Sequence, residues 1–124
     1  STGGILQAEK YALVGPKAIA GIESFHADKA IISCKGFDMD KGLTDINDMF
    51  SQVKQTMLKN ATRRILAVDY TKFDQIGFSR ICGAEDIDMV VTDVQPSDAW
   101  ARYMKDKEVV CFYGDEDQRY RICQ

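Results

Sequence analysis

The stretch that decides the fold runs from Ile31 to Thr44 and reads Ile-Ile-Ser-Cys-Lys-Gly-Phe-Asp-Met-Asp-Lys-Gly-Leu-Thr. It begins as an apolar run, breaks at Gly36 and Gly42, and leads directly into a helix-forming segment. An apolar strand that ends in a polar, glycine-containing loop before a helix is typical of open α/β sheets, whose ligands sit outside the carboxyl ends of the strands. The stretch therefore predicts an α/β fold and one edge of a ligand site.

Further apolar runs along the chain predict the rest of the sheet. Four of them are expected to be strands buried on both faces, at residues 30–34, 65–68, 89–91 and 109–113. Continuous rather than alternating apolar runs are typical of parallel strands covered by helices. A shorter apolar piece at residues 11–14 is predicted to be the first strand, and a short edge strand is expected at residues 120–123.

Three helices are predicted between these strands. The first begins at Pro16, where proline suits the first helical position, and its buried face carries Ala18, Ile19, Ile22 and Phe25. The second is capped by Thr44 or Asp45, and its apolar stripe consists of Ile46, Phe50, Val53 and Met57. The third has an apolar side of Trp100, Tyr103 and Met104. This order predicts an open, mainly parallel, Rossmann-like sheet with helices on both faces, in partial form.

Length and composition indicate one globular domain. The 124 residues are 45% hydrophobic and 28% charged, which is ordinary for such a domain. Residues 1–113 are predicted to form the α/β domain, and residues 114–124 a C-terminal tail. No apolar run approaches the ~20 residues that span a bilayer, and the first residues do not read as a signal peptide, so a cytoplasmic protein without membrane contact is expected. A net charge of −3 and a pI near 5.1 argue against this segment gripping nucleic acid by itself.

The four cysteines, Cys34, Cys82, Cys111 and Cys123, are expected to be free thiols in a reducing compartment. A disulfide and a metal site are the alternatives. No pair has the C-x-x-C spacing of zinc ligands, and the single histidine, His26, is distant from all four in sequence. No metal is therefore predicted.

Polar residues follow each of the first three parallel strands. Lys35, Gly36 and Asp38 follow one strand, Asp69 and Lys72 the next, and Thr92-Asp93 the third. The Gly3-Gly4 turn is a possible fourth strand end, and Lys54 could reach the same edge from its helix. Glycines allow close approach of a ligand, free backbone N–H groups can cradle an anion, and carboxylates accept hydrogen bonds from hydroxyl groups. The set predicts a site for a phosphorylated polyol or sugar.

Each of these residues also has a purely structural interpretation. Lys54 could cover the edge of the core with its stem, Asp69 and Lys72 could pair with each other on the surface, and Asp38 and Gly42 could serve turn geometry. There is no Ser-His-Asp order, Walker sequence or G-x-G-x-x-G motif in the chain. No catalytic residue and no cofactor are predicted.

An ordered set of short motifs resembles the sensor domain of DeoR-type transcriptional repressors over residues 1–113. The motifs are Thr-Gly-Gly at 2–4, Leu-Val-Gly-Pro at 13–16, Ala-Asp-Lys-Ala at 27–30, Gly-Phe-Asp at 36–38, Gly-Leu-Thr at 42–44, Val-Lys at 53–54, Asp-Tyr-Thr-Lys-Phe at 69–73, Ile-Asp at 87–88 and Val-Thr-Asp at 91–93. Such regulators join an N-terminal winged helix-turn-helix, which binds operator DNA, to a ribose-5-phosphate-isomerase-like domain that binds a phosphorylated sugar effector.

The resemblance implies a ligand cleft built from Gly3, Gly4, Gly36, Asp38, Lys54, Asp69 and Lys72. It also implies a homo-oligomer, and a chain cut on the N-terminal side of the sensor domain, so that DNA is bound only by an absent domain. Two departures stand out, because family members commonly have an acidic residue where Phe50 stands and a small or acidic residue where Lys35 stands. Lys35 adds positive charge beside the cleft.

Two other functions compete with an effector sensor. A sugar-phosphate isomerase of related fold would need a carboxylate base such as Asp38 or Asp69. An oligomerisation module without a ligand would need only the apolar edge that truncation leaves uncovered.

Overall fold

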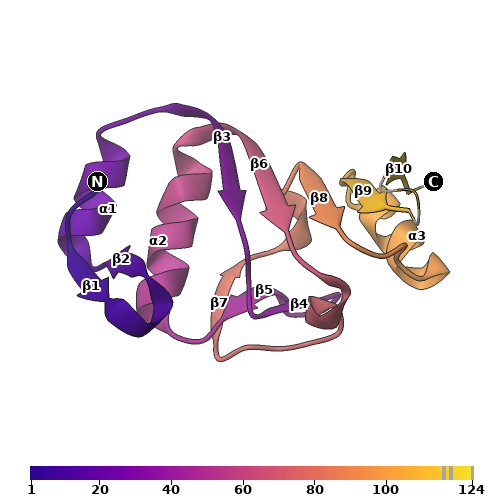
Figure 1. Ribbon diagram of the computed structural model, residues 1–124, viewed down its shortest axis with the longest axis horizontal. Coiled ribbons are helices and arrows are strands. Elements are labelled where there is room, and N and C mark those ends of the chain that lie inside the picture. The colour runs from indigo at the N-terminus through magenta and orange to yellow at the C-terminus, as the bar shows by residue number, and fades with distance from the viewer. Residues whose placement is uncertain (116, 118, 124) are drawn as a thin grey trace.

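A five-stranded sheet forms the centre of the computed structural model, which describes residues 1–115, 117 and 119–123 (Figure 1). The strand order is β10-β9-β8-β6-β3, and every neighbouring pair is parallel except β10 with β9. The strands are β3 (Ala27–Ile32), β6 (Ala61–Ala67), β8 (Met89–Thr92), β9 (Val110–Gly114) and β10 (Tyr120–Ile122). The predicted α/β class with a mainly parallel sheet is confirmed. Three residues of the predicted tail, Glu116, Gln118 and Gln124, lie outside the described residues.

Three helices accompany the sheet: α1 (Pro16–Glu23), α2 (Asp48–Lys59) and α3 (Asp98–Asp106). The N-cap of α2 is Asn47, whose Oδ1 accepts a hydrogen bond from the Phe50 N–H at 3.1 Å. The predicted caps Thr44 and Asp45 are wrong, because both residues belong to a strand that continues up to the turn before the helix. The third helix is capped by Ser97, and it buries Trp100 and Met104 as predicted.

The apolar stripe predicted for α2 faces α1 and the start of β3. Val53 and Met57 are half-buried and line a hollow with Ile22 of α1, while the fully buried residues of α2 are Ser51, Thr56 and Leu58. Phe25, predicted to lie on the buried face of the first helix, is 76% exposed beyond the end of α1. Helix α2 therefore contacts two layers of the molecule. Its apolar side lies toward α1, and its mixed side lies toward the sheets.

Two small antiparallel sheets lie outside the large sheet. Residues 11–14 were predicted to belong to the parallel sheet, but β2 (Ala12–Val14) pairs only with β1 (Ile5–Gln7). The loop after β3 contains a hairpin of β4 (Gly36–Asp38) and β5 (Gly42–Asp45), and β7 (Ser79–Cys82) adds to it in the order β4-β5-β7. A short helical turn at Ala84–Asp86 follows β7.

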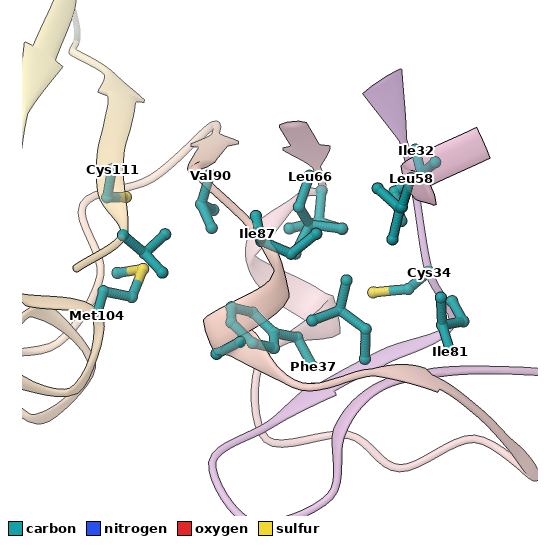
Figure 2. Close-up of a cluster of buried hydrophobic side chains, with 14 of the residues drawn as sticks. Ile32, Cys34, Phe37, Leu58, Leu66, Ile81, Ile87, Val90, Met104 and Cys111 are labelled. Carbon is teal, nitrogen blue, oxygen red and sulfur yellow. The ribbon is translucent and has the colours of Figure 1, made fainter. Parts of the chain in front are cut away.

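The core lies between one face of the large sheet and the β4-β5-β7 sheet. Figure 2 shows the neighbouring residues Ile32, Leu66, Val90 and Cys111 pointing from successive strands toward Leu58, Phe37 and Met104. The opposite face, hereafter the open face, carries Ile31, Ile65, Met89 and Val110 in one row. Ile31 is 61% exposed and Val110 45% exposed. The expected burial of the strands on both faces thus holds for one face only.

In the part of the chain that the structure describes, no helix has the length and apolar character needed to cross a membrane.

Candidate functional site

The carboxyl ends of β3, β6 and β8 meet at one edge of the large sheet. The parallel registers align Ile32 with Leu66 and Ala67 with Val91, so the loops that follow these strands start side by side. Figure 1 shows β3 and β6 pointing toward β4, β5 and the helical turn Tyr70–Lys72. Several of the predicted ligand residues lie in these loops, but their side chains have different environments.

Lys54 and Asp45 form a half-buried ion pair at this edge. The Lys54 Nζ donates to Asp45 Oδ2, and the two side chains are only 19% and 8% exposed. Asp45 also accepts a hydrogen bond from the Ile46 N–H at 2.8 Å, which fixes its carboxylate at the end of β5. Lys54 therefore points inward from the middle of α2, which the functional interpretation of this lysine required. Its ammonium group is, however, already paired with the Asp45 carboxylate.

Asp69 and Lys72 lie on the short helical turn after β6. Asp69 Oδ1 accepts hydrogen bonds from the N–H and the hydroxyl of Thr71, and the Lys72 Nζ lies 4.0 Å from Asp69 Oδ2. The hydroxyl contact is the main reason why the pKa of Asp69 lies below its usual value. Asp93, at the end of β8, accepts a hydrogen bond from the Tyr70 N–H at 2.8 Å and so anchors this turn.

The buried Cys34 thiol is influenced by three of these charges. Burial raises its pKa to about 12, while the nearby ammonium groups of Lys54 and Lys72 lower it and the Asp45 carboxylate raises it. All three charged groups are therefore near one buried sulfur atom, although they come from α2, the Tyr70–Lys72 turn and β5. The structure thus places both predicted lysines at this edge, each beside one carboxylate, so a bound anion would compete with Asp45 and Asp69 for them.

Gly36 and Asp38 have local roles in the hairpin. A Cβ atom on Gly36 would lie 2.2 Å from the Gln75 carbonyl oxygen, so the loop around residue 75 packs where a side chain would be. The Asp38 carboxylate accepts hydrogen bonds from the N–H groups of Asp40 and Lys41 at 2.9 and 2.8 Å, which stabilises the hairpin turn. Lys35 is exposed, and its backbone N–H donates to the Thr44 carbonyl.

The predicted fourth strand end is packed against the first helix. Gly3 and Gly4 adopt φ values of 71° and 107°. A Cβ atom on Gly4 would lie 2.6 Å from the Val14 carbonyl oxygen and 2.9 Å from the Ala18 Cβ, so this turn needs glycine to approach β2 and α1. The neighbours of this turn therefore come from β2 and α1.

Two polar residues at the edge, Thr44 and Asp45, were not included in the predicted site. Asp45 was interpreted as a helix cap, and Thr44 likewise, yet the Thr44 hydroxyl donates to the Gly36 carbonyl and accepts from the Gly77 N–H. Asp93 lies with Asp69 in a hollow of about 520 Å³ at the ends of β6, β8 and β9, whose wall also includes Thr92, Asp115 and Tyr120. A carboxylate shortly before a helix that carries an inward-facing lysine was the available signal for Asp45.

Comparison with known proteins identifies the family of the chain. Residues 1–94 match the family model described as the DeoR C-terminal sensor domain. The chain is 34% identical over 109 residues, or 88% of its length, to the uncharacterised HTH-type transcriptional regulator YulB of Bacillus subtilis. It is 37% identical over 92 residues (74% of the chain) to the HTH-type transcriptional regulator GolR of Listeria innocua, and 31% identical over 93 residues (75%) to the L-fucose operon activator of Escherichia coli.

The chain spans 42%, 36% and 38% of the lengths of these three relatives. Their names describe transcriptional regulators rather than enzymes, which agrees with the prediction that no catalytic set is present. The family model covers the strand-end edge, including Asp45, Lys54, Lys72 and Asp93. The chain therefore belongs to the DeoR C-terminal sensor domain family.

Proposed function

We propose that this chain is the effector-binding part of a sugar-operon transcriptional regulator. A phosphorylated sugar or related metabolite binds at the strand-end edge and controls operator binding by an N-terminal helix-turn-helix domain. The observation that carries the proposal is the placement of Lys54 and Lys72, with their partners Asp45 and Asp69, at the carboxyl-end edge of the sheet. The relatives support it, because they are named as HTH-type regulators or as the activator of the L-fucose operon.

The lysines at the edge suit the phosphate group of such an effector, and the aspartates suit its sugar hydroxyls. The phosphate would bind near Lys54 and Lys72, because ammonium groups in a partly desolvated setting form strong charge-assisted hydrogen bonds. The sugar hydroxyls would donate to the carboxylates of Asp69 and Asp93 in the adjoining hollow. The remaining predicted contacts, Gly3, Gly4, Lys35, Gly36 and Asp38, stay part of the proposed ligand set.

Effector binding would act by population shift. A ligand that binds one conformation of the parent regulator more tightly than another moves the equilibrium toward that conformation. The proposal covers activation as well as repression, because one relative is named an activator. A regulator that binds operator DNA works where the DNA is, so we place the parent protein in the cytoplasm.

The test is a titration of this chain with pentose and hexose phosphates and with the matching free sugars, followed by calorimetry. We expect at least one phosphorylated sugar to bind, and Lys72→Met to weaken that binding by about tenfold or more, since a hydrogen bond to a charged group contributes about 1.5–3 kcal/mol. Lys59→Met is the matched control: this exposed lysine lies at the far end of the helix that carries Lys54. Equal binding of phosphorylated and free sugars would contradict the proposal.

We also propose that the chain self-associates through the open face of the sheet. Ile31 and Val110 expose apolar side chains at the two ends of the row that also contains Ile65 and Met89, and an exposed apolar patch of this kind marks an interaction surface. Ile31→Lys should reduce the mass measured by light scattering toward that of the monomer. A wild-type chain that is monomeric at high concentration would contradict this proposal.

A further inference from the structure

Two cysteines lie opposite each other on the last two strands. The antiparallel register of β9 and β10 aligns Ile122 with Phe112, and its continuation places Cys123 opposite Cys111. The Cys123 N–H donates to the Cys111 carbonyl at 2.8 Å. Hydrogen-bonded opposite residues in an antiparallel pair have Cα atoms about 5.5 Å apart, which lies inside the range that a disulfide spans.

Both thiols face the same space. Opposite residues of an antiparallel pair point to the same face of the sheet, and Cys111 and Cys123 line one hollow of about 540 Å³ with Met104 and Ile122. Cys111 is 2% exposed, whereas Cys123 is half-buried and reachable from solvent. Both are free thiols, and each thiol affects the pKa of the other, which requires the two sulfur atoms to be close.

We propose that Cys111 and Cys123 are a modification site, at which a hydroperoxide oxidises the two thiols to a disulfide that fastens β10 to β9. The Cys123 thiolate attacks one peroxide oxygen, the O–O bond breaks, and a sulfenic acid forms as water or alcohol leaves. The Cys111 thiolate then attacks the Cys123 sulfur, the S–O bond breaks, and a second oxygen leaves as water. Two thiols supply the two electrons that reduce one peroxide.

The chemistry is slow because both thiols are mainly protonated at neutral pH. Burial raises the pKa of Cys111 to about 12 and also raises that of Cys123. The thiolate is the attacking species, so its low fraction limits the rate. The pair therefore responds to sustained oxidation rather than to a brief exposure, and its oxidation accelerates as the pH rises.

The disulfide would fix one wall of the hollow at the strand ends. Tyr120 of β10 and Asp115 line that hollow with Asp69, and the Arg121 guanidinium holds Asp115 at 2.8 Å. Fastening β10 to β9 restricts the movement of this wall. This link between oxidation and effector binding rests on the proposed function, whereas the disulfide itself does not.

The test begins with hydrogen peroxide at about pH 8.5, near the ordinary pKa of a thiol. We expect the intact chain to become two hydrogen atoms lighter and its free thiols to fall from the four cysteines of the reduced chain to two. Trypsin cuts after Lys107, Arg119 and Arg121, so the product should link the peptide of residues 108–119 to that of residues 122–124. Dithiothreitol should reverse the change.

Cys123→Ala should abolish this product, while Cys82→Ser should retain it. In the oxidised chain, the amide hydrogens of β10 should exchange about tenfold more slowly than in the reduced chain. A cross-link between Cys34 and Cys82, an intermolecular dimer, or four remaining thiols after prolonged oxidation would each overturn the proposal. None of these readouts uses a sugar phosphate, so failure of the effector proposal would leave them unchanged.

Discussion

At the scale of single residues, the Lys54–Asp45 ion pair stabilises the carboxyl-end edge of the sheet. With side chains 19% and 8% exposed, neither partner can recover its full hydration if the other is removed. We expect Lys54→Met to lower the free energy of unfolding by about 1–3 kcal/mol, because the Asp45 carboxylate is left half-desolvated without a counterion. Urea denaturation measures this loss.

Two variants control for the loss of charge. Lys35→Met, at an exposed lysine of the neighbouring loop, should change stability by about 0.5 kcal/mol or less. Adding Asp45→Asn to Lys54→Met should restore part of the stability, since the orphaned charge disappears. If Lys54→Met changed the free energy of unfolding as little as Lys35→Met, the Lys54–Asp45 pair would not contribute to stability.

The Asp88 carboxylate links the stability of the fold to pH. Its carboxylate accepts hydrogen bonds from the Arg64 N–H and guanidinium at 2.8 to 3.2 Å, and the guanidinium is the main reason why its pKa lies below 3.8. A depressed carboxyl pKa stabilises the fold above the unfolded value, and this stabilisation is lost as the pH falls through the folded value. We expect a carboxyl titration midpoint below 3.8 by NMR, moving upward in Arg64→Gln. An unchanged midpoint would show that Arg64 does not control this carboxylate.

At the scale of elements, the β4-β5-β7 sheet depends on close backbone contact. A Cβ atom on Gly36 would lie 2.2 Å from the Gln75 carbonyl oxygen, whereas on Gly114 it would lie 3.3 Å from the Asp93 carbonyl oxygen. Gly36→Ala should therefore lower the free energy of unfolding by about 2 kcal/mol or more, because backbone must move. Gly114→Ala, also in a strand, should lower the free energy of unfolding much less. Denaturation of the two variants and the wild-type chain measures the difference. Equal effects would mean that the loop around residue 75 adjusts freely.

The long elements were predictable, and the short ones were not. The runs that became β3, β6, β8 and β9 are apolar enough to indicate strands without tertiary information. Strands β4 and β5 are only three and four residues long, and Gly36 and Asp38 are turn formers. They become strands because Phe37 and Leu43 are fully buried and β7 completes the sheet. Such tertiary support has no local sequence signature.

The candidate site likewise contains some residues whose positions were predictable from the sequence and others whose positions were not. The strand-end rule placed Lys72 and Asp69 at the correct edge, and helical geometry placed Lys54 at its boundary. The Asp45 partner of Lys54 could not be predicted, because its position depends on β5 running up to residue 45. The Gly3-Gly4 turn was expected at a strand end, but β1 and β2 pair with each other.

At the scale of the whole molecule, the N-terminal hairpin and α1 form a separately packed unit. Val14 and Ala18 are fully buried, yet the contiguous core cluster begins at Ala30. The hollow of about 690 Å³ between α1, α2 and the start of β3 lies between this unit and the rest of the molecule. We expect amide hydrogens of α1 to exchange well before those of β6 and β8. Simultaneous exchange of all three would show one cooperative unit.

The ion pair inside the edge makes recognition of an anion a competition. An anionic ligand that reaches Lys54 competes with the Asp45 carboxylate for its ammonium group. A singly charged ion therefore gains little, whereas a doubly charged phosphate gains more. Because the second ionisation of a phosphate ester has a pKa of about 6, the effector itself would lose its advantage as the pH falls below that value. The selectivity for a doubly charged effector and the weaker binding in acid would then both come from the ionisation of the ligand. The Asp45 carboxylate would set how much negative charge a ligand needs to compete for Lys54.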